Sequence, residues 1–171
     1  MTPFIALIRA VNVGGTGKLP MRDLQSICEH IHFTRIRTYI ASGNVVFLSK
    51  LSEAEVKAAL EERLAAYANR PIGVLVRTAA QMAAVVTSNP FPNAAPNRTL
   101  TNFLDEPPAV NVLDSVTGKD EEELCLGLRE IYVHYGDGMA RSKLKIPAAK
   151  NGTARNMNTV AKLALMALEL R

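Results

Sequence analysis

The order of β-rich and helical patterns in residues 1–78 is the feature that most restricts the fold. Four β-rich runs lie at Pro3–Val11, Ile36–Ala41, Val45–Leu48 and Ile72–Val76. Pro20 favours a helix that runs to about His30, because proline is common in the first turn of a helix. Ser52 and Glu55 have capping-box spacing and begin a second helix. The apolar face of that helix consists of Val56, Leu60 and Leu64. This β-α-β-β-α-β order is that of the ferredoxin-like α/β plait.

Residues 79–171 have a less regular pattern. Helices are expected at Ala79–Thr87, at Ala109–Ser115 and from about Asn156 to Leu170, and strands at Thr99–Leu104, Glu123–Leu126 and Ile131–Tyr135. The prolines of Asn89–Asn97 indicate a loop. This order is that of a plait whose last strand is missing. We therefore predict an α+β fold in which a ferredoxin-like half, residues 1–78, packs against a second, related α+β half, residues 79–171, as one compact unit.

Composition is that of an ordinary globular protein. Hydrophobic residues make up 48% of the 171 residues, enough for a substantial core. The early apolar run Phe4–Ile8 is too short for a signal peptide or a membrane span, so we expect a cytoplasmic protein with no membrane partner. The net charge of +4 mildly favours anionic partners. Aromatic residues make up only 5% of the chain, and the scarcity of base-stacking surfaces disfavours binding of single-stranded nucleic acid.

Three short segments have an unusual density of Asn, Gly, Ser and Arg. They are Arg9–Lys18, Thr38–Asn44 and Ala154–Thr159, and the loop Asp137–Leu144 accompanies them. With further matches at Asn89–Pro92 and Arg129–Tyr135, the chain resembles, over nearly its whole length, the bacterial domain-of-unknown-function family numbered 1697. That family has no assigned activity, so the resemblance implies no particular reaction.

Two positions depart from the residues usual in that family. Met157 stands where relatives usually carry Trp, which removes an indole N–H donor. Ala10 stands where they commonly carry Gly, which suggests that the backbone at this position need not adopt a positive φ.

The loop Asn12–Lys18 lies between a predicted strand and a predicted helix. Backbone N–H groups and a helix N-terminus can hold a phosphate at such a place. The loop does not match a P-loop, which needs Gly at Asn12 and Ser or Thr at Leu19, and a dinucleotide fingerprint would need Gly at Pro20. The alternative interpretation is a flexible loop whose glycines only permit turning.

The segment Ser42–Asn44 separates two predicted strands and indicates a tight hairpin, because Gly and Asn tolerate the positive φ of primed turns. Turn geometry alone would explain these residues. In a β-α-β-β plait, however, the end of the first strand and the turn after the second strand emerge at the same edge of the sheet. We therefore expect this turn to lie beside residues Gly14–Lys18 of the preceding loop.

Two further segments contribute cations. Four polar residues have the spacing of one stripe on the final helix: Arg155, Asn158, Thr159 and Lys162. The alternatives are that Asn156 or Asn158 is an ordinary N-cap and that Arg155 precedes the helix. Arg141–Lys143 follows a glycine-rich turn, for which the alternative is a solvated basic loop.

The remaining residues that could carry chemistry form no recognisable centre. No metal site is predicted. The side chains of Cys28, His30 and His32 do not all share one face of a helix end, and the two cysteines of the chain have no CxxC spacing. The acidic run Asp120–Glu123 is interpreted as a solvated turn. No serine elbow, HExxH motif or paired carboxylates occur, so a hydrolase would have no visible nucleophile or base.

The sequence favours binding of a phosphate-bearing ligand, a nucleotide or structured nucleic acid, because the motif segments have more donors than carboxylates. The predicted ligand-binding residues are Arg9, Asn12, Gly14, Gly15, Lys18, Ser42, Gly43, Asn44, Arg141, Lys143, Arg155 and Asn158. One alternative is an enzyme acting on a phosphorylated or anionic small molecule, with Lys18 or Lys143 as acid or base. Another is a structural or interaction protein whose motifs only fix the interface between the halves. The sequence specifies neither a cofactor nor an oligomeric state.

Overall fold

The computed structural model describes residues 1–13 and 17–170. The chain divides into two compact units. The first comprises Met1–Ala83 together with the chain from Leu163 onward, and the second comprises Ala84–Lys162. Two helices contribute to both units: α3 (Ala79–Thr87) and α4 (Met157–Leu168).

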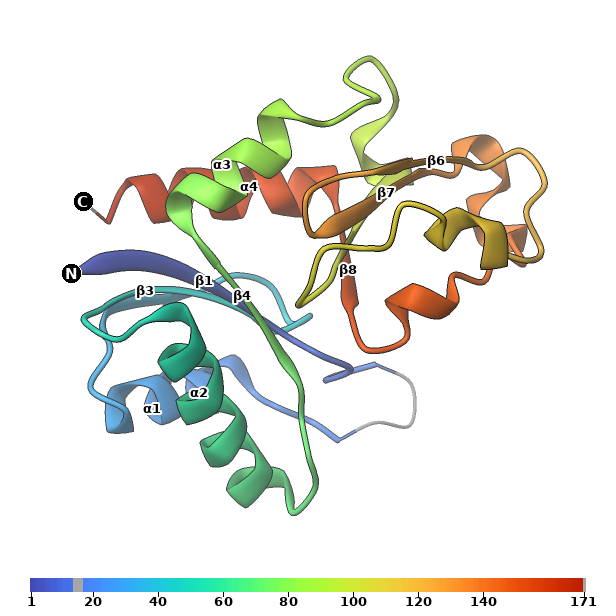
Figure 1. Cartoon of the computed structure of the whole chain (residues 1–171). Coiled ribbons are helices and arrows are strands. Elements are labelled where there is room, and N and C mark those ends of the chain that lie inside the picture. Colours follow the sequence, from blue (N-terminus) through green and yellow to red (C-terminus); the bar gives the residue numbers. More distant parts are fainter. Residues whose placement is uncertain (14–16, 171) are drawn as a thin grey trace. The chain divides into compact units, whose positions relative to one another are not determined.

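The first unit is built on a four-stranded sheet with the order β2-β3-β1-β4 (Figure 1). Its strands are β1 (Thr2–Ile8), β2 (Thr34–Thr38), β3 (Asn44–Ser49) and β4 (Val74–Thr78), and every neighbouring pair is antiparallel. Helix α1 (Met21–His30) connects β1 to β2, and helix α2 (Glu53–Ala68) connects β3 to β4. This is the ferredoxin-like plait, so the fold predicted for the first half is confirmed.

Helix α2 begins where the sequence indicates. The Glu55 backbone N–H donates to Ser52 Oγ at 3.3 Å, and the Ser52 N–H donates to Glu55 Oε2 at 2.8 Å, which completes the predicted capping box. The predicted apolar face is buried and consists of Val56, Leu60 and Leu64. The helix ends at Asn69, whose φ of 55° is left-handed, as is common where helices stop.

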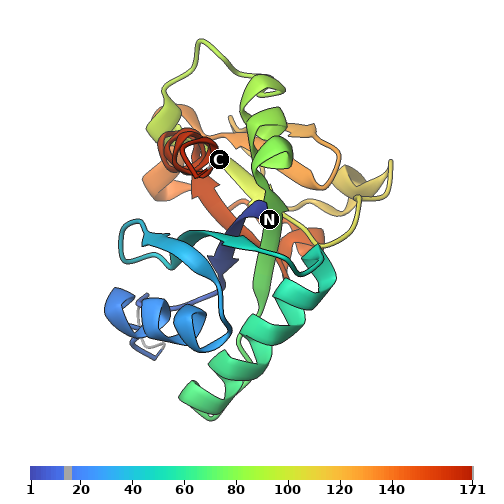
Figure 2. The same cartoon turned by 90° about the vertical axis from the view of Figure 1, so that its left-hand side faces the viewer.

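Both faces of this sheet are buried. One face packs with α1 and α2, and there the Phe33 and Phe47 rings stack with centroids 4.1 Å apart. On the other face, Arg37 Nη1 pairs with Glu169 Oε2 at 2.8 Å, and Arg35 Nη1 donates to the Leu170 carbonyl at 3.4 Å. Figure 2 shows α1 and α2 below the sheet and the end of α4 above it. A sheet covered on both faces explains why β1 and β3 are nearly continuous apolar runs.

The second unit has a sheet with the order β6-β7-β5-β8. Its strands are β5 (Thr99–Phe103), β6 (Glu123–Leu126), β7 (Glu130–His134) and β8 (Thr153–Asn156), again antiparallel throughout. Counted along the chain within each unit, both sheets have the order second-third-first-fourth, which confirms two related α+β halves. Short 3₁₀ turns interrupt the connections of the second unit: η1 (Pro96–Arg98), η2 (Val112–Ser115), η3 (Gly136–Arg141) and η4 (Pro147–Ala149).

Two expectations for the second half were wrong. The strand expected to be missing is present as β8, and it pairs Arg155 with Thr101 of β5. Its four residues, Thr-Ala-Arg-Asn, have no apolar alternation, so only its distant pairing partner reveals the strand. The helix expected at Ala109–Ser115 is only the turn η2, because the preceding prolines and the β-branched and short polar residues of this segment do not favour an α-helix.

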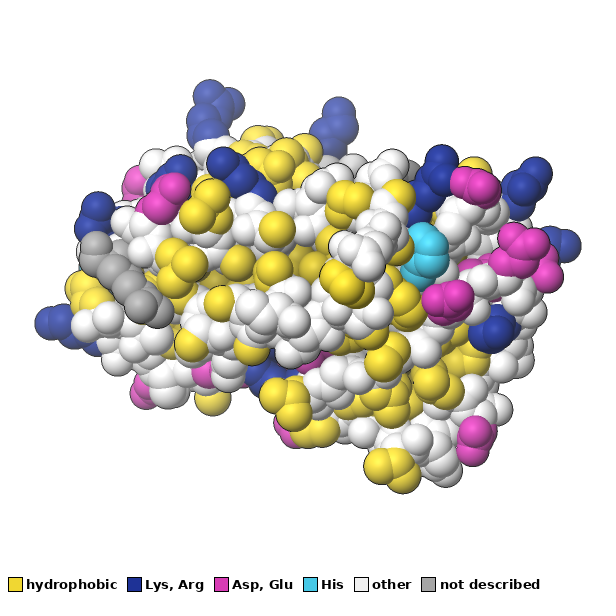
Figure 3. Space-filling model, turned by 90° about the horizontal axis from the view of Figure 1, so that it is seen from above, with side chains coloured by type: hydrophobic (Ala, Val, Ile, Leu, Met, Phe, Trp, Pro, Cys, Tyr) yellow, Lys and Arg dark blue, Asp and Glu magenta, His cyan; other side chains and the backbone are white. Residues whose placement is uncertain are grey.

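The start of α4 follows one of the predicted alternatives. Asn156 Oδ1 accepts from the Thr159 backbone N–H at 3.0 Å, so Asn156 acts as the N-cap. On the surface in Figure 3, hydrophobic side chains lie among charged ones. Helix α4 exposes Leu165 and Leu168. No helix within residues 1–13 and 17–170 is both long and apolar enough to cross a membrane.

Candidate functional site

Asn12 organises the loop that follows β1. Its Nδ2 donates to the carbonyls of Leu19 at 2.8 Å and Ala41 at 2.7 Å, and its Oδ1 accepts from the Leu19 N–H at 2.6 Å. Its backbone N–H donates to the Gly17 carbonyl at 3.2 Å. The start of the loop therefore lies beside the β2–β3 connection, while residues 14–16 of the segment predicted to adjoin Ser42–Asn44 lie outside the described residues. Gly14 and Gly15, two predicted ligand-binding residues, lie outside the described residues.

The β2–β3 connection is longer than the predicted tight hairpin. It spans residues 39–43, because β2 ends at Thr38 after a register shift near Arg35, whose φ is 52°. Asn44 is the first residue of β3 and is fully buried. Its Nδ2 donates to the Tyr39 carbonyl at 2.9 Å and to Ser42 Oγ at 2.8 Å. Through these two hydrogen bonds, the buried side chain of Asn44 fixes the conformation of the turn.

Gly43 allows the same turn to approach β1. Its φ is 88°, and a Cβ here would lie 2.8 Å from Val11 Cγ2. The Gly43 carbonyl accepts from the Ile8 N–H at 2.8 Å. Only glycine combines this backbone conformation with such close packing.

Arg9 and Ala10 lead out of β1. The Arg9 N–H donates to the Gly73 carbonyl at 2.9 Å, and a Cβ added at Gly73 would lie 3.0 Å from Arg9 Cδ. The inference that Ala10 need not adopt a positive φ was wrong, since its φ is 48°. The chain turns sharply at this point, and alanine accepts a conformation that costs a residue with a Cβ about 1–2 kcal/mol.

A cavity of about 280 Å³ opens beside this loop. Its lining residues come from the loop, from the end of α2 and from the segment between α2 and β4: Val11, Gly17, Lys18, Leu19, Tyr67, Ala68, Arg70 and Ile72. We call it the cationic cavity, because these residues include two cations and no carboxylate. The predicted residue Lys18 is exposed at this cavity.

Arg70 is the lining residue that sequence reasoning missed. Its Nη2 is buried and has no hydrogen-bond partner within residues 1–13 and 17–170, and a Cβ at Gly17 would lie 3.5 Å from that nitrogen. The strand pairing could have pointed to Arg70, because Val74, the first residue of β4, pairs with Ile8, the last residue of β1. Residues just before β4 therefore lie near the loop that follows β1.

Tyr67 lies at the same cavity with 43% of its surface exposed. Its hydroxyl donates to Asp23 Oδ2 at 2.7 Å, and this hydrogen bond raises the tyrosine pKa. The bond fixes one end of the side chain and leaves the ring accessible.

The predicted residues of the second unit have different environments. Arg155 lies in β8 and not on the final helix. It is 8% exposed, its Nη1 donates to Thr153 Oγ1 at 2.8 Å and to the Ala154 carbonyl at 2.9 Å, and burial lowers its pKa to about 10. Asn158 is exposed in the first turn of α4.

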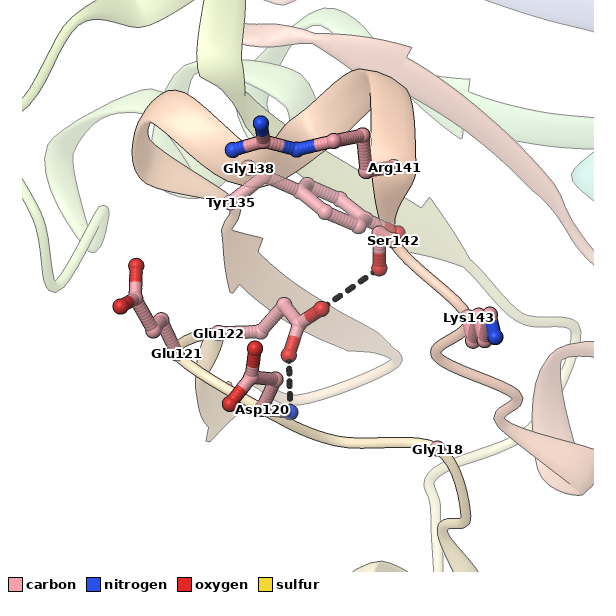
Figure 4. Close-up of a pocket in the computed structure, with 9 residues that line it drawn as sticks. All are labelled: Gly118, Asp120, Glu121, Glu122, Tyr135, Gly138, Arg141, Ser142 and Lys143. Atoms are coloured by element: carbon pink, nitrogen blue, oxygen red, sulfur yellow. Dashed lines mark hydrogen bonds between the residues drawn. The ribbon is translucent and has the colours of Figure 1, made fainter.

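Arg141 and Lys143 line a second cavity, of about 320 Å³ (Figure 4). We call it the mixed-charge cavity, because it is also lined by the carboxylates of Asp120, Glu121 and Glu122. The interpretation of the acidic run as a solvated turn was wrong at Glu122, which is 5% exposed. Its carboxylate accepts from Ser142 Oγ and from the Asp120 N–H, both at 2.6 Å, and these bonds lower its pKa.

Cysteine and metal chemistry have little support. Cys28 is buried, and desolvation raises its pKa to about 12, so its thiol stays protonated near neutral pH. Within the described part of the chain, no three His, Cys, Asp or Glu side chains are grouped closely enough to hold a metal ion.

Comparison with known proteins places the chain in a family. The sequence model of a protein of unknown function, DUF1697, matches residues 1–132. This chain belongs to the DUF1697 family. The match includes all residues of the cationic cavity, whereas it ends before Tyr135 and Arg141–Lys143 of the mixed-charge cavity.

A solved structure resembles this DUF1697 protein along almost its entire length. It is that of the conserved bacterial protein SP0830 from Streptococcus pneumoniae, which is 25% identical, with a TM-score of 0.80. The alignment covers 97% of this chain and 98% of that one. No curated protein matches the sequence. These comparisons show the family and the fold.

Proposed function

We propose that this DUF1697 protein binds a phosphate-bearing ligand in the cationic cavity. The observation that carries the proposal is the buried Arg70 Nη2, which has no hydrogen-bond partner among the described residues. A buried donor without a partner costs about 1–3 kcal/mol, and more when it is charged. An anion in the cavity would supply the missing acceptor and remove this cost.

The charge of the lining supports an anion over a neutral ligand. Lys18 and Arg70 contribute positive charge, and none of the described lining residues is acidic. Arginine can donate two parallel hydrogen bonds to phosphate oxygens, and lysine acts as a point charge. Lys18 lies in the loop that Asn12 closes through its hydrogen bonds to Leu19.

The volume limits how much of the ligand the cavity encloses. At about 280 Å³ it lies near the lower end of the range for small-molecule pockets. A phosphate group and little more would be enclosed, with the rest of a nucleotide or nucleic acid outside. The exposed ring of Tyr67 offers one apolar surface for that remainder. We expect binding of nucleic acid to weaken steeply with added salt, because it would depend mainly on phosphate contacts.

Thermal unfolding tests the proposal. Inorganic phosphate, pyrophosphate and ATP should each be compared with sodium chloride of equal ionic strength. A ligand that binds only the native state raises the unfolding midpoint, by roughly 2–4 °C for each kcal/mol of stabilisation in a chain of this size.

Arg70→Ala should abolish the phosphate-dependent rise. Arg63→Ala is a matched control, because Arg63 is an exposed arginine of α2 that does not line the cavity. The control should retain the rise. Equal shifts with chloride and phosphate in the wild type, or equal shifts in the two variants, would contradict the proposal.

A further inference from the structure

The mixed-charge cavity of the second unit lies between two loops that are fixed to each other. Thr117 and Lys145 form a β-bridge, with N–H···O distances of 3.1 and 2.8 Å. Gly118 has a φ of 70°, and a Cβ there would lie 2.0 Å from the Lys143 carbonyl oxygen. The buried Glu122 carboxylate accepts a hydrogen bond from the Ser142 hydroxyl of the opposite loop. The cavity walls are therefore held by backbone pairing, close packing and a charge-assisted hydrogen bond.

Four exposed side chains of opposite charge line this cavity without pairing: Asp120, Glu121, Arg141 and Lys143. Their side chains make no hydrogen bond or ion pair with another residue in the described ranges. In Figure 4 the Glu121 and Asp120 carboxylates lie on one side, and the Arg141 guanidinium lies across from them. The cavity therefore leaves an open space between its acidic and its basic side chains.

We propose that this cavity binds a small zwitterion, a molecule with an ammonium group and a carboxylate, such as a free amino acid. Asp120 and Glu121 would hold the ammonium group, and Arg141 would bind the carboxylate. Glu122 strengthens the negative side, because its two hydrogen bonds keep it ionised.

Singly charged ligands fit this lining less well. A simple anion would face three carboxylates, and a simple cation would face Arg141 and Lys143. A bound metal ion is not favoured, because the described acidic residues do not form a metal-ligating group. The proposal is independent of phosphate binding, since the cationic cavity belongs to the other unit.

The test is an NMR titration of the ¹⁵N-labelled full chain. Glycine, β-alanine and γ-aminobutyrate separate their two charges by increasing distances, and N-acetylglycine and glycinamide each retain one charge. At least one zwitterion should shift amides of residues 118–122 and 135–143 saturably. It should bind at least about tenfold more tightly than either singly charged analogue, because a charge-assisted contact typically contributes that much or more.

Matched variants separate direct contacts from general charge effects. Glu121→Gln and Arg141→Gln should each lower the affinity for the tightest-binding zwitterion by about tenfold or more. Glu106→Gln and Lys162→Gln, exposed positions of the same unit outside the lining, should leave its affinity unchanged. Absence of saturable shifts with all three zwitterions, equal binding of a singly charged analogue, or unchanged affinity in Arg141→Gln would each overturn the proposal.

Discussion

The two four-stranded sheets have the same strand order, but their connections differ. In the first unit, α1 and α2 connect successive strands of the plait and bury the residues that pack on one face of the sheet. In the second unit, the segments between β5 and β6 and between β7 and β8 contain only 3₁₀ turns among the described elements. Helices therefore connect the strands of the first unit, while loops with 3₁₀ turns, in close contact at Gly118, connect those of the second.

This difference also separates the two cavities. The cationic cavity lies where a loop meets the end of a long helix, and its cations come from segments positioned by Asn12 and Asn69. The mixed-charge cavity lies between two loops, so both of its walls come from the connections. The comparison indicates that strand order fixes the framework, whereas the connections determine the chemistry of each site.

The largest effect is expected from Gly118→Ala. A Cβ at this position would overlap the Lys143 carbonyl, and the φ of 70° adds strain, so we expect a loss of roughly 4 kcal/mol in the free energy of unfolding. Gly138→Ala is the control, because nothing lies within 4 Å of a Cβ there. Urea unfolding measures both variants. Similar stabilities would show that the loops of the second unit do not depend on this contact.

A smaller difference should separate the connections of the two units. Leu60→Ala in α2 should cost about 3 kcal/mol, because the side chain is fully buried in the core. Leu113→Ala in η2 should cost about 1 kcal/mol, since that side chain is only partly buried. Chemical denaturation of both variants tests this. Equal losses would mean that the 3₁₀ turn contributes as much to stability as the helix.

The smallest effect concerns the turn after β1. Ala10→Gly should leave the free energy of unfolding unchanged or raise it by about 0.5 kcal/mol. Glycine removes the strain of the positive φ, but its greater conformational freedom in the unfolded chain offsets part of that gain. Val13→Gly provides a control at an exposed position of the same loop, where no positive φ is present. A clear loss of stability in Ala10→Gly on thermal unfolding would contradict the strain assigned to Ala10.

Local signals were sufficient to predict the first plait. The Ser52–Glu55 capping box and the apolar spacing of α2 are properties of neighbouring residues, and both appear as expected. The four-residue strand β8 depends on pairing with β5, about fifty residues away, and has no apolar pattern of its own. The sequence therefore contained no sign that Arg155, assigned to a stripe of the final helix or to the residues before it, lies in a strand.

The candidate sites were harder to predict than the fold. Asn12, Gly43 and Asn44 were identified by residue type, and the structure shows them shaping the turns around β1. Arg70 was missed because it lies in no motif and becomes notable only through burial without a partner. Glu122 looked like any residue of a charged turn until its bond to Ser142 was visible.

The most direct test of the phosphate-site proposal is one ¹⁵N NMR titration with inorganic phosphate at constant ionic strength. Our account predicts saturable shifts for amides near the cationic cavity, residues 17–19 and 67–70, while those of residues 118–122 and 135–143 stay unchanged. These shifts should disappear in Arg70→Ala and persist in Arg63→Ala. Shifts spread over both cavities, or shifts that survive in Arg70→Ala, would contradict phosphate binding through Arg70.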